Sequence, residues 1–284
     1  MKRMLFALVI IALGIQGAVA QPVDTLGRIK AAHVVNVAYS PDSLPFSLAG
    51  TGSEPAGYTI DLCKRVIAQI GRTVGEPNLK INWMVGGVTE RLAMVGSGRA
   101  DLECANTTET LTRLASVDFS NLIFVDGGGF LVKTDSPLNK LADMAGKKIA
   151  VQKGTTTETR LRDSLQRRLV NATVVTIGDA SEGTALLESG GVDAFAGDKI
   201  KLVGLAAQAK DPKKLALLAE DLSFEPYGLA IPRNDSGYRL EVNRALTQVY
   251  MGGDIEPIFA QWLGKLGRPS GLLAAMYLLN SIPD

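Results

Sequence analysis

The chain has 284 residues, 46% of them hydrophobic, and at about 150 residues per domain it is long enough for one large or two small domains. Its 30 basic and 29 acidic side chains give a formal net charge of +1. This balance lacks the basic excess that is typical of proteins bound to nucleic acid or to an anionic membrane surface. We therefore expect a globular protein without a nucleic-acid partner.

The N-terminal residues 1–20 have the pattern of a secretory signal peptide. Lys2 and Arg3 precede an apolar run over 5–15, and the small residues of 18–20 form a cleavage site. The apolar run is shorter than the ~20 residues that a membrane-spanning helix needs. We expect the signal peptide to be removed and the rest of the chain to be exported.

Strands and helices are predicted to alternate along the exported part. In chain order the elements are strand 34–39, helix 59–70, strand 80–84, helix 89–95, strand 102–105, a helix from about residue 111, and an apolar segment at 122–125. After Gly127–Gly129 come an extended segment at 130–133, a short helix at 138–144, strand 149–151, a helix from 155 to about 170, strand 174–177, an extended segment at 224–231, and helices at 238–251 and 255–266. This alternation indicates an α/β fold.

A helix–Ser-Gly–strand motif occurs twice, at residues 90–106 and 182–198, with five identical positions. Each copy ends at a polar residue just past its strand, Asn106 in the first copy and Asp198 in the second. Open α/β sheets bind ligands beyond the carboxyl ends of their strands. The repeat therefore suggests two lobes that present polar groups to a shared cleft.

Two short extended segments, 127–133 and 224–231, are predicted to cross between these lobes. The second lobe is then inserted into the first, and the crossings form a two-strand hinge. This arrangement predicts that lobe 1 comprises 21–128 and 225–284, and that lobe 2 comprises 129–224.

The two cysteines, Cys63 and Cys104, lie on the apolar faces of a predicted helix and a predicted strand. An exported protein permits a disulfide between them, but two buried free thiols fit the same pattern. The single histidine, His33, has no partner at metal-ligand spacing, and we interpret it as structural or solvated. We expect no metal and no cofactor.

Motifs of hydrolytic and nucleotide-dependent enzymes are absent from the sequence. There is no Gly-x-Ser-x-Gly, His-Glu-x-x-His, Gly-x-Gly-x-x-Gly or P-loop pattern, and Gly127–Gly129 lacks the Lys-Thr that a phosphate-binding loop carries. We therefore expect a binding protein rather than an enzyme.

Thr107, Thr108 and Arg113 form one candidate site at the predicted start of a helix. Hydroxyls, unpaired N–H groups and a guanidinium together favour a carboxylate, although an ordinary helix cap beside a solvated arginine has the same pattern. Thr155 and Thr156 begin a helix of the other lobe and offer matching donors.

Asp198 is an anion at a strand end among apolar residues, so it needs a partner. The partner is either the ammonium of a ligand or a neighbouring lysine, Lys199 or Lys201. Arg91, at the start of a predicted helix, is a second candidate cation at the cleft. Together these groups complement the carboxylate and the ammonium of an α-amino acid.

At these residues the chain resembles the periplasmic amino-acid-binding proteins of ABC uptake systems, solute-binding protein family 3, especially the glutamate/aspartate type. The resemblance covers nearly the whole exported chain. It is carried by Leu44-Pro-Phe46, Gly57-Tyr-Thr-Ile-Asp-Leu62, Asp101-Leu-Glu-Cys-Ala-Asn-Thr-Thr108 with Arg113, Val117-Asp-Phe-Ser120, Leu141-Ala-Asp-Met-Ala-Gly-Lys147 and Lys153-Gly-Thr-Thr-Thr-Glu158. It implies a periplasmic binding protein-like fold of type II, in which two Rossmann-like lobes close on a ligand.

The resemblance also implies roles for individual residues. Arg113 with Thr108 would hold the ligand α-carboxylate, and Thr155 or Thr156 would add donors from lobe 2. Asp198 would pair with the α-ammonium. Phe46 would form an apolar wall, and Arg91 would approach a side-chain carboxylate.

The sequence departs from the glutamate/aspartate type at Ser40, near which those binders carry a further arginine. This departure leaves a neutral polar amino acid open as the ligand. The glutamate/aspartate type can also place its second cysteine in the late crossing, where this chain has Leu229. The pairing of Cys104 is therefore open as well.

The sequence thus predicts a monomeric periplasmic protein that captures a polar, acidic L-amino acid and delivers it to an ABC permease. One alternative is a dehydratase of the cyclohexadienyl type on the same fold, with Glu103 or Asp198 as proton donor. The other is a ligand sensor that acts on a membrane receptor.

Overall fold

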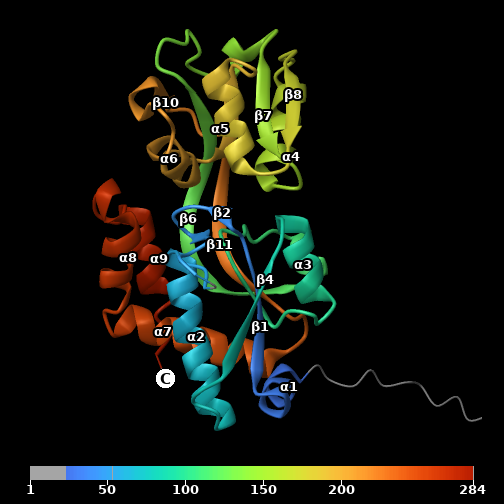
Figure 1. Ribbon diagram of the computed structural model, residues 1–284, viewed down its shortest axis with the longest axis vertical. Coiled ribbons are helices and arrows are strands. Elements are labelled where there is room, and N and C mark those ends of the chain that lie inside the picture. The colour runs from blue at the N-terminus through green and yellow to red at the C-terminus, as the bar shows by residue number, and fades with distance from the viewer. Residues whose placement is uncertain (1–23, 53, 284) are drawn as a thin grey trace, which may run out of the picture.

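The computed structural model describes residues 24–52 and 54–283, so the predicted signal peptide lies outside the described residues. Two α/β bodies, called lobe 1 and lobe 2 below, are joined by the long strands β6 (Asp118–Lys133) and β11 (Ser223–Ile231) (Figure 1). Among the described residues, no helix is both long enough and apolar enough to cross a membrane. The structure confirms the predicted pair of lobes connected by two strands.

Lobe 1 contains both ends of the described chain. Its elements are α1 (Thr25–Ala32), β1 (Val34–Tyr39), β2 (Asp42–Ser43), β3 (Ser47–Leu48), α2 (Tyr58–Val74), β4 (Lys80–Val85), α3 (Val88–Gly96), β5 (Leu102–Cys104), η1 (Arg113–Ala115), α7 (Ser236–Met251), α8 (Ile255–Leu263), η4 (Gly264–Leu266) and α9 (Gly271–Leu279). Strand β1 pairs in parallel with β4 on one side and with β5 on the other.

Lobe 2 lies between the two long strands in the sequence. Its elements are η2 (Leu141–Met144), β7 (Lys148–Gln152), α4 (Thr156–Arg167), β8 (Thr173–Ile177), α5 (Ala180–Ser189), β9 (Ala194–Asp198), α6 (Lys199–Ala207), η3 (Pro212–Lys214) and β10 (Leu215–Leu217). The order β4-β1-β5-β11-β6-β9-β7-β8 makes one continuous sheet through both lobes. The loops that follow β1, β5, β7 and β9 therefore lie where the lobes meet.

Each lobe has its own hydrophobic core. In lobe 1, α2 buries apolar residues at helical spacing, including Ile60, Val66 and Ile70, in one cluster with β1 and α7. In lobe 2, neighbouring positions on β7 bury their side chains on opposite faces, Ile149 against α4 and Ala150 against α5 and α6. The two lobes are therefore separate packing units connected by β6 and β11.

Strand β6 continues through Gly127–Gly129, which lie in the predicted crossing over 127–133. There it pairs with β11 on one side and β9 on the other. A Cβ on Gly128 would lie 2.2 Å from Ser223 Oγ, and one on Gly129 would lie 2.7 Å from Lys199 Cε. The glycines are therefore explained by the close approach of neighbouring segments.

The helix predicted from about residue 111 is wrong, since only the short turn η1 forms there. The preceding segment is held in an extended conformation by β11. Thr108 forms a bridge with Tyr227, and the Glu109 N–H donates to Pro226 O at 2.8 Å. Backbone pairing with the hinge strand thus prevails over the local helical pattern.

Candidate functional site

A cavity of about 50 Å³ lies between the two lobes. Lobe 1 contributes Ser40, Ser43, Val88, Arg91, Asn106, Thr108 and Arg113 to its lining. Lobe 2 contributes Gln152, Thr155, Thr156, Thr157, Phe195, Ala196, Gly197, Asp198, Lys201, Leu202 and Leu205. Seven of the nine residues proposed from the sequence as ligand contacts are in this lining, and Thr107 and Phe46 are not.

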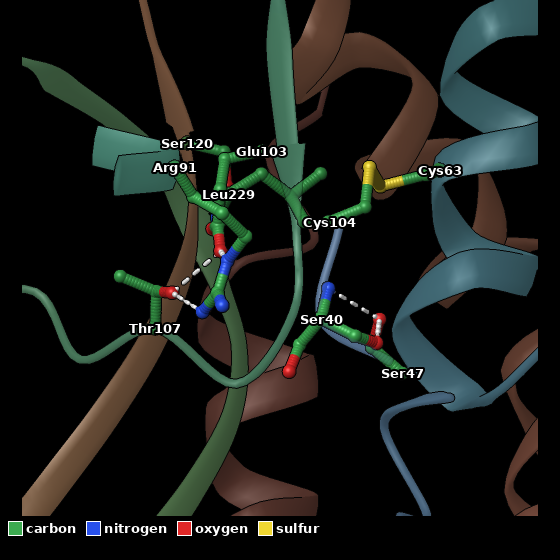
Figure 2. Close-up of a disulfide and its surroundings, with 9 residues drawn as sticks. All are labelled: Ser40, Ser47, Cys63, Arg91, Glu103, Cys104, Thr107, Ser120 and Leu229. Carbon is green, nitrogen blue, oxygen red and sulfur yellow. Dashed lines mark hydrogen bonds and ion pairs between the residues drawn. A yellow bond between two sulfur atoms is a disulfide. The ribbon is translucent and has the colours of Figure 1, made fainter. Parts of the chain in front are cut away.

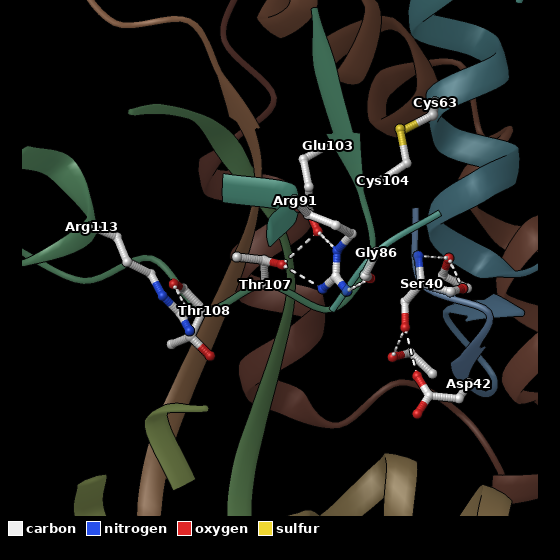
Figure 3. A network of polar contacts seen from close by, with 12 residues as sticks. Ser40, Asp42, Cys63, Gly86, Arg91, Glu103, Cys104, Thr107, Thr108 and Arg113 are labelled. Carbon is white, nitrogen blue, oxygen red and sulfur yellow. Dashed lines mark hydrogen bonds and ion pairs between the residues drawn. A yellow bond between two sulfur atoms is a disulfide. The ribbon is translucent and has the colours of Figure 1, made fainter. Parts of the chain in front are cut away.

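Arg113 is positioned by the extended segment that follows β5. Its Nη1 donates to the Thr108 carbonyl at 2.7 Å, as Figure 3 shows. No carboxylate lies within 4.0 Å of this guanidinium among the residues that the structure describes. Burial lowers the pKa of Arg113, against the opposing influence of the carboxylates of Glu103, Glu225 and Asp198. A ligand carboxylate would supply the missing counter-ion.

Glu225, on the hinge strand β11, connects the two walls of the cavity. Its side chain is 1% exposed and accepts hydrogen bonds from Thr108 Oγ1 of lobe 1 at 2.5 Å and from Thr156 Oγ1 of lobe 2 at 2.8 Å. The two threonine hydroxyls lie 3.3 Å apart, and Ser223 also donates to Glu225. Sequence reasoning missed this residue, although a carboxylate inside a predicted crossing segment is a signal that could have found it.

Asp198, at the end of β9, accepts hydrogen bonds from both lobes. Asn106 Nδ2 and Tyr227 OH each donate to its Oδ2 at 2.8 Å, and Thr157 donates to its Oδ1 at 3.0 Å. Burial, followed by the charge of Glu225, raises the pKa of this carboxyl. The two ends of the repeated motif, Asn106 and Asp198, therefore meet across the cleft.

Neither lysine that the sequence offered as a partner forms an ion pair with Asp198 in the described part of the chain. Lys199 pairs with Asp221 at 2.5 Å, and Lys201 donates to Gln152 Oε1 at 2.9 Å. A neighbouring lysine, one of the two partners that the sequence allows for Asp198, is therefore not observed in that role. The ammonium of a ligand remains the candidate partner of Asp198.

Arg91 borders the cavity, but its charge is balanced inside lobe 1. Its Nε donates to Glu103 Oε1 at 2.7 Å, its Nη1 donates to Gly86 O at 2.8 Å, and both ends of the pair are buried. Thr107 donates to the same Glu103 oxygen at 2.7 Å (Figures 2 and 3). Glu103 and Thr107 lie behind the arginine rather than in the lining, so Glu103 is not placed as a proton donor to a ligand.

Phe46 is placed differently from the sequence expectation. Its ring is fully buried, and its centroid lies 5.0 Å from that of Phe124, 5.3 Å from that of Tyr227 and 6.0 Å from that of Tyr58. The apolar ring gains more from this aromatic cluster than from a polar cavity. Phe46 supports the cleft from within lobe 1 and does not form its wall.

A disulfide joins Cys63 on α2 to Cys104 on β5, as Figure 2 shows. Of the two alternatives that the sequence left open, the bridge is therefore the one observed, and Leu229 is a buried residue of β11. The bridge ties α2 to the last residue of β5 within lobe 1. His33 ends α1 with an exposed side chain 3.3 Å from Glu76, and it is not part of the cavity lining.

Across from lobe 2, the loop after β1 presents a carboxylate that sequence reasoning did not single out. Asp42 Oδ2 accepts from the backbone N–H of Ala180 at 2.9 Å, and its Oδ1 accepts from the Ser40 hydroxyl at 2.8 Å. Burial alone would raise the pKa of Asp42, but Lys201, the Ala180 N–H and Ser40 together lower it below its ordinary value. Asp42 therefore stays charged and caps α5 from the opposite lobe.

The cavity offers non-covalent recognition. Arg113 is a donor for a carboxylate, and Asp198 is an acceptor for an ammonium. Among the described residues there is no group of three or more His, Cys, Asp or Glu side chains that could hold a metal ion.

Comparison with known proteins agrees with this architecture. The family described as bacterial extracellular solute-binding proteins, family 3, matches residues 35–265. The L-glutamate/L-aspartate-binding protein of Pseudomonas aeruginosa is 30% identical over 249 residues, which cover 87% of this chain and 82% of that protein. The glutamate/aspartate import solute-binding protein of Escherichia coli is 27% identical over 273 residues, which cover 94% and 90%.

A solved structure of an ancestral arginine-binding protein bound to glutamine superposes with a TM-score of 0.72 at 26% identity, covering 82% of this chain and 98% of that chain. This similarity confirms the periplasmic binding protein fold. The relatives are solute-binding proteins rather than enzymes. The chain belongs to the bacterial extracellular solute-binding proteins of family 3.

Proposed function

We propose that this protein captures an acidic L-amino acid, glutamate or aspartate, between its lobes and delivers it to an ABC permease. The observation that carries the proposal is the pair Arg113 and Asp198. They carry opposite charges, line one cavity from opposite lobes, and have no protein counter-ion within 4.0 Å among the described residues. An α-amino acid carries the complementary carboxylate and ammonium.

In this proposal the α-carboxylate binds the Arg113 guanidinium, with backbone N–H donors from Thr108, Thr155 and Thr156. The α-ammonium binds Asp198, whose raised pKa reflects a buried carboxylate without a cation. An ammonium at hydrogen-bond distance favours the charged carboxylate and so contributes to binding. Asn106 holds Asp198 in place from lobe 1.

Ligand capture is coupled to closure because the two ends of the ligand bind different lobes. Thr108 and Thr156 approach within 3.3 Å, and a Cβ on Gly154 of lobe 2 would lie 2.5 Å from Thr89 Oγ1 of lobe 1. Such contacts form only when the lobes are together. We assign 21–128 and 225–284 to lobe 1 and 129–224 to lobe 2, with the hinge at the boundaries.

The acidic side chain of the ligand is supported by the names of the Pseudomonas and Escherichia relatives. The same proposal includes export to the periplasm through the signal peptide 1–20, action as a monomer and delivery to a permease. Escherichia coli's relative is an import protein, which favours a transporter over a sensor as the partner.

The experiment is isothermal titration of the exported chain, refolded from denaturant with its disulfide intact, against the proteinogenic L-amino acids. The best ligand is then compared with its N-acetyl and α-amide derivatives. We expect each derivative to lose at least about a hundredfold in affinity, because each removes one of the two charges. Equal affinity for ligand and derivatives would rule out recognition of the zwitterion by Arg113 and Asp198.

A further inference from the structure

Lys201 is a buried cation in the same cavity that the proposed recognition of an α-amino acid does not use. It is the third residue of α6, its exposed fraction is 8%, and it lines the cavity from lobe 2. Its ammonium makes one hydrogen bond, to Gln152 Oε1 at 2.9 Å. Within the described residues, no carboxylate oxygen lies within 4.0 Å of its Nζ.

A lysine ammonium has three donors, and burial without a counter-ion is costly. The two carboxylates with the strongest electrostatic influence on Lys201 are those of Asp42 and Asp198, and neither forms an ion pair with it. Asp42 accepts hydrogen bonds from Ala180, Ser40 and the Gln152 amide, and Asp198 accepts from Asn106, Tyr227 and Thr157. Burial lowers the pKa of Lys201 below its ordinary value, and the charges of Asp42 and Asp198 only partly oppose this shift. Among the described residues, the ammonium uses one of its three donors.

Around Ser40 and Asp42, the described residues of lobe 1 supply no cation that is free of a carboxylate partner. Ser40 stands where the resemblance led us to expect an arginine, and its hydroxyl donates to Asp42. Arg91 also borders this part of the cavity, but its Nε donates to Glu103. In the part of the cavity near Ser40, an unpaired positive charge therefore comes from lobe 2.

The charge balance of the cavity lining follows from these pairings. Among the residues that line the cavity, Arg91 is paired with Glu103, which leaves Arg113 and Lys201 as cations and Asp198 as an anion, while the carboxylates of Asp42 and Glu225 lie outside the lining. The complement of this lining is a molecule with two carboxylates and one ammonium. A neutral amino acid would leave Lys201 without a carboxylate within 4.0 Å among the described residues and the ligand.

We infer that Lys201 binds the side-chain carboxylate of a dicarboxylic amino acid, and that it thereby replaces a lobe-1 arginine with a lysine from lobe 2. This inference rests on the proposed function and adds the residue that sets its selectivity. Because Lys201 and Arg113 lie on different lobes, the two carboxylates of the ligand are then held from opposite sides. The side chain of the ligand contributes to closure as well as to affinity.

The test compares L-glutamate with L-glutamine, which have nearly the same shape and differ in the side-chain charge. Calorimetric affinities are measured for the full exported chain, for Lys201→Gln and for Lys199→Gln. Lys199 is the matched control, since it lies two residues away on α6, pairs with Asp221 and does not line the cavity. We expect Lys201→Gln to lower the glutamate-to-glutamine affinity ratio at least tenfold and Lys199→Gln to leave it unchanged.

A purely structural role for Lys201 would lower both affinities together and keep the ratio, which would overturn the inference. Lys201→Arg retains the charge and is expected to keep a preference for glutamate, with a thermal unfolding scan confirming that each variant is folded. A wild-type protein that prefers glutamine would also overturn the inference while leaving an amino-acid-binding function in place. A wild-type protein that binds no amino acid would overturn the proposed function itself.

Discussion

Asp42 of lobe 1 accepts a hydrogen bond at 2.9 Å from the backbone N–H of Ala180, the first residue of helix α5 in lobe 2. The carboxylate thus lies at the positive end of a helix that belongs to the opposite lobe. This contact exists only while the lobes are together. It couples closure of the cleft to one charged side chain outside the cavity lining.

Asp42→Ala is expected to weaken ligand binding by about tenfold or more, since a hydrogen bond to a charged group contributes about 1.5–3 kcal/mol. Calorimetry measures the affinity, and small-angle scattering of the ligand-saturated protein measures how far the lobes close. Asp179→Ala is the control, because Asp179 caps the same helix from within lobe 2. The control should lose about 1 kcal/mol of stability and little affinity. Equal losses of affinity in both variants would contradict a role in closure.

Arg113→Met is expected to abolish measurable amino-acid binding and to leave the thermal unfolding midpoint nearly unchanged. The reason is that Arg113 makes one hydrogen bond to the Thr108 carbonyl and no ion pair among the described residues. Calorimetry and a thermal scan check the two parts. Arg99→Met, at an exposed position of lobe 1 outside the cavity lining, should bind normally. A large loss of stability with affinity intact would make Arg113 a structural residue.

Glu103→Gln is expected to destabilise the fold by about 3 kcal/mol, because it leaves the buried Arg91 charge without its partner. The double variant Arg91→Met/Glu103→Gln should recover part of this loss, since the uncompensated charge is then gone. Urea unfolding of the two single variants and the double variant gives the coupling energy. Strictly additive losses would mean that the pair does not compensate charge.

Asp126 on β6 is expected to make stability depend on pH. Burial, and then the charge of Asp198, raise its pKa from 3.8 to about 7. The folded protein therefore holds this proton more tightly than the unfolded chain does. The resulting stabilisation is fully present below about pH 4 and is lost as the pH rises to about 7.

Urea unfolding at several pH values, for the wild type and for Asp126→Asn, checks this prediction. The amide mimics the protonated carboxyl and does not titrate. The wild type should therefore lose stability relative to the variant between about pH 4 and 7, by up to about 1.4 kcal/mol for each tenfold difference in proton affinity between the folded and unfolded states. Parallel pH profiles of the two proteins would show that Asp126 does not titrate in this range.

Reduction of the Cys63–Cys104 bridge is expected to cost about 4 kcal/mol of unfolding free energy, because the bridge closes a loop with a sequence separation of 41. Both cysteines lie in lobe 1, so ligand affinity should change little under conditions where the reduced protein is still folded. Urea unfolding and calorimetry with and without a reductant separate the two effects. Loss of binding by a folded, reduced protein would show that the bridge positions the cavity.

Much of the fold follows from local pattern, because strands such as β1 and helices such as α2 carry clear apolar periodicity. The repeat also placed Asn106 and Asp198 correctly at facing strand ends. The segment after Asn106 was predicted as a helix because nothing local reveals its pairing with β11. That pairing joins residues far apart in the sequence.

The site was predicted less completely than the fold, and for a related reason. The partner of Arg91, Glu103, lies on a different element, so the spacing of residues in the sequence does not reveal that the two charges compensate each other. The resemblance implied that Phe46 forms a wall of the cleft, and the sequence does not reveal that aromatic rings from three other segments enclose it. Asp42 and Lys201 were not selected as site residues because their importance depends on how the lobes meet.

Calorimetric titration of the refolded protein with L-glutamate and L-aspartate tests the central claim most directly. We expect at least one of them to bind in a one-to-one complex, and Arg113→Met to remove this binding without unfolding the chain. A folded wild-type protein that releases or absorbs no binding heat with either ligand at several temperatures would contradict the claim.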